Sequence, residues 1–119
     1  MITFSSSVPA SVGGGGSTSS LYADTTDDNF GLGEGLAFHA DAEDNVAIGE
    51  NALNSTSGAA LRNIAIGTDA LTALTTGDDN IVLGNATGDA MTDTSETILI
   101  GTSAGSAITG TDSDGTIAF

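Results

Sequence analysis

Residues 63–67, Asn63-Ile64-Ala65-Ile66-Gly67, decide the fold because the chain repeats this pentapeptide with small changes. The related stretches are Asn29-Phe30-Gly31-Leu32-Gly33, Asn45-Val46-Ala47-Ile48-Gly49, Asn80-Ile81-Val82-Leu83-Gly84 and Thr97-Ile98-Leu99-Ile100-Gly101, with a truncated copy at Thr116-Ile117-Ala118-Phe119. Their starts are separated by 16, 18, 17, 17 and 19 residues. A period of this length predicts an all-β solenoid of about five turns over residues 29–119.

Within each copy the second and fourth residues are large and apolar, whereas the middle residue is usually small. This alternation is typical of a strand with one buried face. We therefore expect the second and fourth residues to face a core and the middle residue to face outward. The expected core residues are Val46, Ile48, Ile64, Ile66, Ile81, Leu83, Ile98 and Ile100. The expected outward residues are Gly31, Ala47, Ala65, Val82 and Leu99.

The residues at the two ends of each strand suit corners of a coil. The glycines that follow the strands, Gly33, Gly49, Gly67, Gly84 and Gly101, favour positive φ or a close approach to the neighbouring turn. The Asn that starts most copies tolerates the left-handed conformation and can hydrogen-bond along a stack of identical side chains. A weaker apolar element after the Gly, such as Ala70-Leu71, predicts a second strand in each turn.

The spacing of apolar residues also bears on assembly. A hexapeptide β-helix would place an apolar residue at every sixth position, but steps of six from Ile66 reach Thr72, Asp78 and Gly84. A turn with so few large apolar side chains is expected to complete its core with copies of itself. Threefold association, with the strand faces meeting on a common axis, is the simplest closed arrangement.

Residues 45–53 and 63–77 resemble the head repeats of trimeric autotransporter adhesins, and the similar repeats of bacteriophage fibre and virion proteins. The resemblance covers residues 29–119 and implies a left-handed parallel β-roll assembled as a homotrimer. The chain shows no signal peptide, stalk or membrane anchor and starts at a natural-looking Met1, which favours a small virion protein that decorates a capsid or forms a fibre. The alternative is an adhesin head on a bacterial cell surface that binds a host receptor or matrix protein.

Charge limits the partners. The formal net charge is −15, from 16 acidic residues against one Arg and no Lys. Such a chain has little with which to neutralise phosphates, so neither nucleic acid nor an anionic membrane surface is an expected partner. No cysteine is present, so disulfides do not contribute.

Residues 1–28 break the repeat and contain a run of four glycines, Gly13 to Gly16. Their composition predicts a flexible or extended arm. Within it, Ile2, Phe4 and Val8 alternate with other residues and are candidates to add as a strand to a capsid or tail protein.

Acidic residues gather before the strands, at Asp27-Asp28, Asp41 with Glu43-Asp44, Asp78-Asp79, Asp93 with Glu96, and Asp112 with Asp114. Stacked turns would align them along one edge, where Ca²⁺ could relieve their repulsion. Their spacing matches no EF-hand loop, so we expect a solvated acidic edge and no cofactor, with Ca²⁺ at this edge as the alternative.

Other side chains give no indication of catalysis. His39 has no nucleophile or second base in a recognisable pattern, and Arg62 is expected to pair with a neighbouring carboxylate. The short turns offer no deep cleft for a pair of catalytic carboxylates, and the expected outward row lacks the Thr array of an ice-binding solenoid. The sequence therefore predicts a protein that is not an enzyme.

Overall fold

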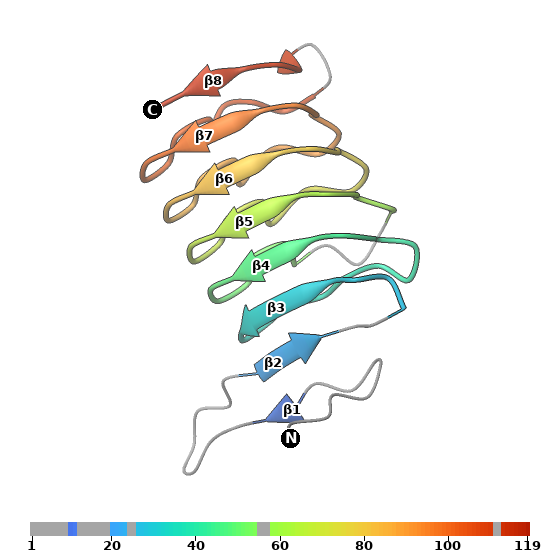
Figure 1. The fold of residues 1–119 in the computed structure, drawn as a ribbon. Coiled ribbons are helices and arrows are strands. Elements are labelled where there is room, and N and C mark those ends of the chain that lie inside the picture. The colour runs from blue at the N-terminus through green and yellow to red at the C-terminus, as the bar shows by residue number, and fades with distance from the viewer. Residues whose placement is uncertain (1–9, 12–19, 24–25, 55–57, 111–112) are drawn as a thin grey trace.

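The computed structural model describes residues 10–11, 20–23, 26–54, 58–110 and 113–119. These residues form one eight-stranded sheet in which the strands follow each other in chain order (Figure 1). The strands are β1 (Ala10–Ser11), β2 (Ser20–Ala23), β3 (Phe30–Gly33), β4 (Val46–Ile48), β5 (Ile64–Ile66), β6 (Ile81–Leu83), β7 (Ile98–Ile100) and β8 (Ile117–Ala118).

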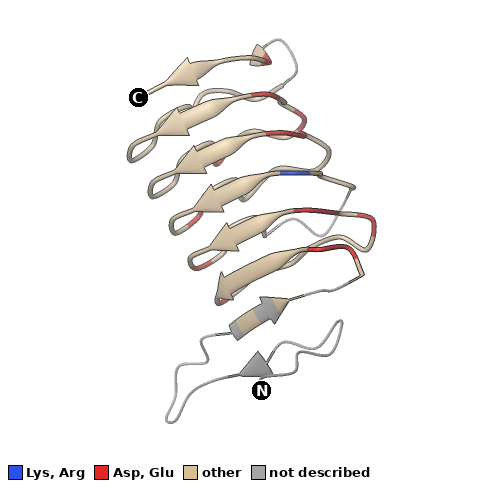
Figure 2. Ribbon diagram, viewed as in Figure 1, with Lys and Arg blue, Asp and Glu red and all other residues tan. Residues whose placement is uncertain are grey.

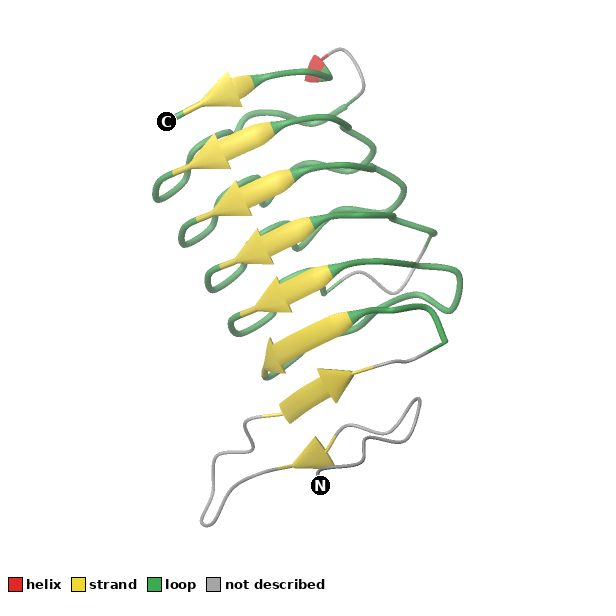
Figure 3. Ribbon diagram, in the orientation of Figure 1, coloured by secondary structure: helices red, strands yellow, loops and turns green. Residues whose placement is uncertain are grey.

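From β3 to β8 the pairing is parallel, and each connection is one turn of a coil (Figure 1). Equivalent residues of successive repeats are direct partners, as in Ile64 with Ile81 and Ile66 with Leu83. The strands lie on one side of the coil, and loops and turns return the chain behind them (Figure 3). The chain is thus an all-β solenoid of about five turns, as the repeat predicts.

The sheet begins before the first repeat. β2 pairs antiparallel with β3, with Leu21 opposite Leu32, and β1 pairs antiparallel with β2. Both short strands therefore fall within the segment expected to be an arm. Ile2, Phe4 and Val8 lie outside the described residues, so their docking role stays a prediction.

The middle residue of each strand points into the coil, so the expectation that it faces outward is wrong. Ala47, Ala65, Val82 and Leu99 are each 0% exposed and belong to the core cluster. They pack in a cluster that also contains Leu71, Leu74 and Met91 from the return side of the coil. A single chain therefore already encloses an apolar core without contributions from other copies.

The expected second strand is also absent from the described residues. The Ala-Leu elements form turns, and one isolated bridge joins Ala37 to Asn54. The cause is local, because Leu71 and Asp69 both have positive φ, 53° and 57°, which interrupts extended backbone. Ala70 and Leu71 are nevertheless fully buried, so this element contributes to the core as expected.

Candidate functional site: the outer face of the parallel strands

The second and fourth residues of each repeated pentapeptide form a continuous apolar surface on the strands, called here the apolar strand face. The parallel register aligns them in two rows. The first row is Phe30, Val46, Ile64, Ile81, Ile98 and Ile117, and the second is Leu32, Ile48, Ile66, Leu83 and Ile100. The more exposed members are between 37% and 63% exposed, and the remainder are partly buried. No residue in either row is charged.

The structure thus brings all eight predicted core residues, Val46, Ile48, Ile64, Ile66, Ile81, Leu83, Ile98 and Ile100, onto one face. The face lies on the outside of the single chain. Leu21 extends it onto β2, because residues directly opposite each other in an antiparallel pair project from the same side of the sheet.

A buried ladder of asparagine side chains holds the strand starts in line. Asn29, Asn45, Asn63 and Asn80 are at most 3% exposed. The Oδ1 of each accepts a hydrogen bond from the backbone N–H of the equivalent residue in the next turn, at 2.9 to 3.1 Å, and Thr97 ends the series. Because each turn is fixed to the next at the same atom, the two apolar rows stay in register. The predicted hydrogen-bonded ladder is therefore confirmed.

The same side chains join the strands to the return side of the coil. Asn45 Nδ2 donates to the carbonyl of Ala60 at 2.7 Å, and Asn63 Nδ2 donates to that of Gly77 at 2.9 Å. The residue before each Asn, rather than the Asn itself, has the left-handed conformation, as with Arg62 at φ 57°. The sequence interpretation misplaced this corner by one residue.

The predicted corner glycines end the strands and permit close stacking. Gly33, Gly49, Gly67, Gly84 and Gly101 have φ between 124° and 150°. A Cβ on Gly67 would overlap the backbone carbonyl of Gly84 in the next turn. Only a residue without a side chain fits between the turns at this corner.

Charged residues border the apolar strand face along the edge where the strands begin, opposite the edge formed by the corner glycines. The left-handed residues that precede each Asn or Thr are all exposed, and we call them the acidic corner row: Asp28, Asp44, Arg62, Asp79 and Glu96. Backbone hydrogen bonds stack this corner, such as Asp79 N–H to the carbonyl of Leu61 at 3.0 Å. The described acidic residues of this row therefore align along one edge, as Figure 2 shows, whereas Asp112 lies outside the described residues.

Arg62 pairs with a carboxylate of the next turn in its own chain. Its Nε and Nη2 donate to the two carboxylate oxygens of Asp79, at 2.7 and 2.9 Å. This hydrogen-bonded pair raises the pKa of the Arg62 guanidinium and lowers the pKa of the Asp79 carboxyl. The expected pairing of Arg62 with a carboxylate is confirmed.

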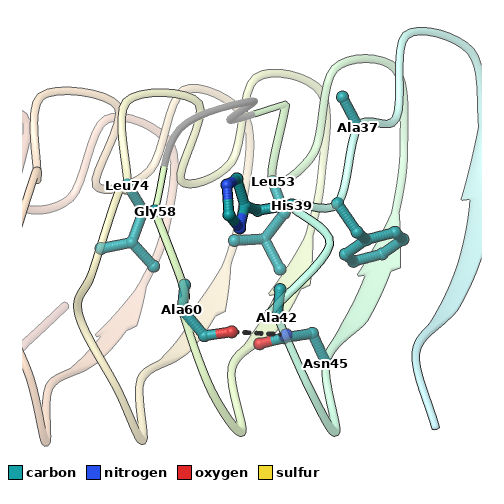
Figure 4. A pocket seen from close by; sticks show the side chains of 9 residues that line it. Ala37, His39, Ala42, Asn45, Leu53, Gly58, Ala60 and Leu74 are labelled. Atoms are coloured by element: carbon teal, nitrogen blue, oxygen red, sulfur yellow. Dashed lines mark hydrogen bonds between the residues drawn. The ribbon is translucent and has the colours of Figure 1, made fainter. Parts of the chain in front are cut away.

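The described residues also contain a small pocket beside His39 (Figure 4). Phe38, Leu53 and Leu74 contribute to its lining. Its cavity of about 10 Å³ has room for roughly one water molecule, not for a substrate. His39 itself accepts a hydrogen bond at Nδ1 from the backbone N–H of Asp41, at 3.2 Å.

Within the described ranges, no group of three or more His, Cys, Asp or Glu side chains is placed to hold a metal ion. No helix in that part of the chain is long and apolar enough to cross a membrane. The apolar strand face is the strongest candidate for a functional surface because its two apolar rows are aligned and largely exposed.

Comparison with known proteins adds no family. No protein-family model, curated protein or solved structure matches this chain.

Proposed function

We propose that this protein is a non-enzymatic structural module that assembles as a homotrimer through the apolar strand face. In this proposal the trimer decorates or reinforces the surface of a bacteriophage virion, and the N-terminal segment attaches it to a capsid or tail protein. The alternative role is the head of a trimeric adhesin on a bacterial surface. The observation that carries the proposal is the exposure of two continuous apolar rows on a chain of net charge −15.

The amount of exposed apolar surface favours a partner. Soluble monomers rarely expose a large contiguous apolar patch, and patches of this kind commonly mark interaction sites. Here the patch follows the sheet from β3 to β8, with Phe30 and Ile117 near its two ends and both exposed. The rest of the chain carries 16 acidic residues, so the apolar rows are a local departure from a strongly charged surface.

Another copy of the chain suits this face better than an unrelated partner. Every turn presents the same pair of side chains in the same register, and the face carries no charge that a partner would have to neutralise. Three such faces on a common axis would cover one another with equivalent contacts. The resemblance of the repeats to trimeric head modules supports three copies rather than two.

Sedimentation equilibrium at neutral pH and moderate salt tests the assembly. We expect the mass of three chains, and a monomer at every concentration and salt examined would refute the proposal. The variant Ile81→Asp places a carboxylate in the first row, where assembly would bury it without a partner, so we expect folded monomer. The matched control Thr109→Asp adds the same charge at an exposed position on the return side and should leave the trimer intact.

The attachment role needs a second experiment. A deletion should stop at residue 9, because Ala10–Ser11 pairs with β2 and a longer deletion would disturb the sheet. If the protein decorates a virion, the shortened trimer should stay folded but fail to bind purified particles that bind the full chain. Retention on the particles would contradict attachment through Ile2, Phe4 and Val8. Binding of the shortened trimer to host cells instead would favour the adhesin role.

A further inference from the structure

The strand ends form a second corner beside the proposed interface, called here the glycine corner, which consists of each corner glycine and the two residues that follow it. In the first three turns, counted from β3, this corner carries a carboxylate, from Glu34, Glu50 and Asp69. In the last two turns it carries Asn85 and Thr102 instead. Figure 2 shows acidic segments after β3, β4 and β5, and none directly after β6 and β7. The charge of the glycine corner is therefore confined to the N-terminal part of the coil.

A closed threefold arrangement places the glycine corner of one chain beside the acidic corner row of the next. Each chain presents its strand starts on one side of the apolar strand face and its strand ends on the other. Rotation about a common axis brings the starting edge of one face to the ending edge of its neighbour. The boundary between two chains is therefore formed by two unlike corners.

Like charges meet at this boundary in the first two turns. The strands run across the coil (Figure 1), and a rotation does not shift the chains along the axis, so corners of the same turn lie level. In the first turn, Asp28 then lies beside Glu34 of the neighbouring chain. In the second turn, Asp44 lies beside Glu50 of that chain. All four residues are exposed in the single chain and carry carboxylates.

The same boundary is complementary in the last two turns. There the acidic corner row contributes Asp79 and Glu96, which lie level with Asn85 and Thr102 of the neighbouring chain. Both of these neutral residues are exposed, and their amide and hydroxyl groups are hydrogen-bond donors that suit a carboxylate. The arginine of the chain is also at this end of the row, because the Arg62 guanidinium is bonded to Asp79 of the fourth turn.

We infer that the trimer interface is electrostatically graded and weakest at the first two turns, so that the assembled trimer opens from its N-terminal end. This inference rests on the proposed homotrimer. Apolar burial is similar in every turn, because each contributes two aliphatic or aromatic side chains. The repulsion between carboxylates opposes it in the first two turns only. The end that opens is the end that carries the N-terminal segment, so attachment through that segment would act on the loosest turns.

Single introduced thiols test the gradient, because the chain has no cysteine of its own. Val46→Cys and Ile98→Cys place a thiol in the first apolar row of the second and the fifth turn, at positions that are both partly buried in the single chain. Labelling rates with a maleimide are divided by the rates in the monomeric Ile81→Asp background. In the trimer we expect the second-turn thiol to react at least about fivefold faster than the fifth-turn thiol on this scale, because like charges oppose closure beside it.

The outcomes of this experiment separate the gradient from the trimer. Equal protection of the two thiols in a chain that sediments as a trimer would overturn the gradient and leave the trimer intact. Labelling of both thiols at the monomer rate, together with a monomer mass, would refute the trimer itself. In 1 M NaCl, which screens exposed charges beyond about 3 Å, the difference between the two thiols should shrink.

A second pair of variants assigns the gradient to the glycine corner at constant net charge. Glu50→Gln with Asn85→Asp moves one carboxylate from the second turn of this corner to the fourth. The control Asp41→Asn with Thr109→Asp moves one carboxylate between exposed positions outside both corners. The first pair should slow labelling of the second-turn thiol and speed labelling of the fifth-turn thiol, whereas the control should change neither. An unchanged ratio of the two rates in the first pair would overturn the assignment.

Discussion

The Oδ1 of Asn63 accepts two hydrogen bonds from Asn80, one from its backbone N–H at 3.0 Å and one from its Nδ2 at 2.9 Å. Both residues are 0% exposed, so the bonds form without competition from solvent. One turn earlier, the Oδ1 of Asn45 accepts the equivalent two hydrogen bonds from the backbone N–H and the Nδ2 of Asn63. One side chain therefore fixes the position of the next turn and satisfies polar groups that the coil would otherwise bury unpaired.

Replacement of Asn63 by Ala should strongly destabilise the coil. The change removes partners from the Asn80 N–H and the Gly77 carbonyl, and each such buried group costs about 1 to 3 kcal/mol when left unsatisfied. We expect the free energy of unfolding to fall by about 3 kcal/mol or more, measured by chemical denaturation and circular dichroism. The control Asn85→Ala removes an exposed side chain whose one recorded bond is 3.4 Å long. Equal losses in the two variants would show that the ladder adds little.

The corner glycines differ in what lies next to them, which gives a matched pair of variants. An added Cβ at Gly67 overlaps the Gly84 carbonyl, whereas at Gly101 the nearest atom is 3.8 Å away, on Phe119. Both positions have positive φ, 139° and 124°, so both variants to Ala carry backbone strain.

We therefore expect Gly67→Ala to lower the thermal midpoint clearly more than Gly101→Ala, because it adds a steric overlap between turns. Differential scanning calorimetry of the two variants measures the difference. A larger effect at Gly101 would mean that strain, not stacking, determines the need for glycine.

Much of the coil could be predicted from the repeat because the period acts on every turn at once. The alignment of Asn63 with Asn80 and the close approach at Gly67 both follow from placing equivalent residues one strand spacing apart. The partner of Arg62 could be narrowed to a neighbouring carboxylate for the same reason. These features depend only on which residues are stacked on one another. The repeat spacing identifies those residues directly.

The inner and outer sides of the strands could not be decided from the pattern. Alternation shows that Ile64 and Ile66 share a side and that Ala65 faces the other, but it does not say which side is enclosed. The larger residues are expected inside a core, yet the interior of this narrow coil accepts Ala65 beside Leu71 and Leu74. The left-handed corner at Arg62 could have been found only by aligning the repeats, because Arg62 itself gives no indication of positive φ whereas the equivalent Asp44 and Asp79 are of a residue type that tolerates it.

The Arg62–Asp79 pair should make a small, pH-dependent contribution to stability. The pKa of the Asp79 carboxyl is lowered in the folded chain, mainly by its hydrogen bond to Arg62. A depressed folded-state pKa contributes stability that is present above the unfolded-state pKa and is lost as pH falls through the folded-state value. We expect Arg62→Gln to remove this contribution and to raise the Asp79 pKa, as measured by NMR titration of the carboxyl carbon. Arg62→Lys keeps the positive charge but not the bidentate hydrogen bonds, so it should raise the Asp79 pKa by less than Arg62→Gln does. An unchanged Asp79 pKa in Arg62→Gln would contradict the pairing.

Leu99 and Ile100 are adjacent aliphatic residues that test the assignment of the two sides. Leu99 is 0% exposed in the core of the coil, whereas Ile100 is 39% exposed on the apolar strand face. In the monomeric Ile81→Asp background, Leu99→Ala should lower the free energy of unfolding by about 2 to 5 kcal/mol, because it leaves a cavity. Ile100→Ala should cost about 1 kcal/mol, since its side chain is already partly in water. Urea denaturation of the two variants gives the comparison. In the assembled background Ile100→Ala should become costlier and shift the trimer toward monomer. A larger cost for Ile100→Ala than for Leu99→Ala in the monomeric background would mean that the strands are turned the other way.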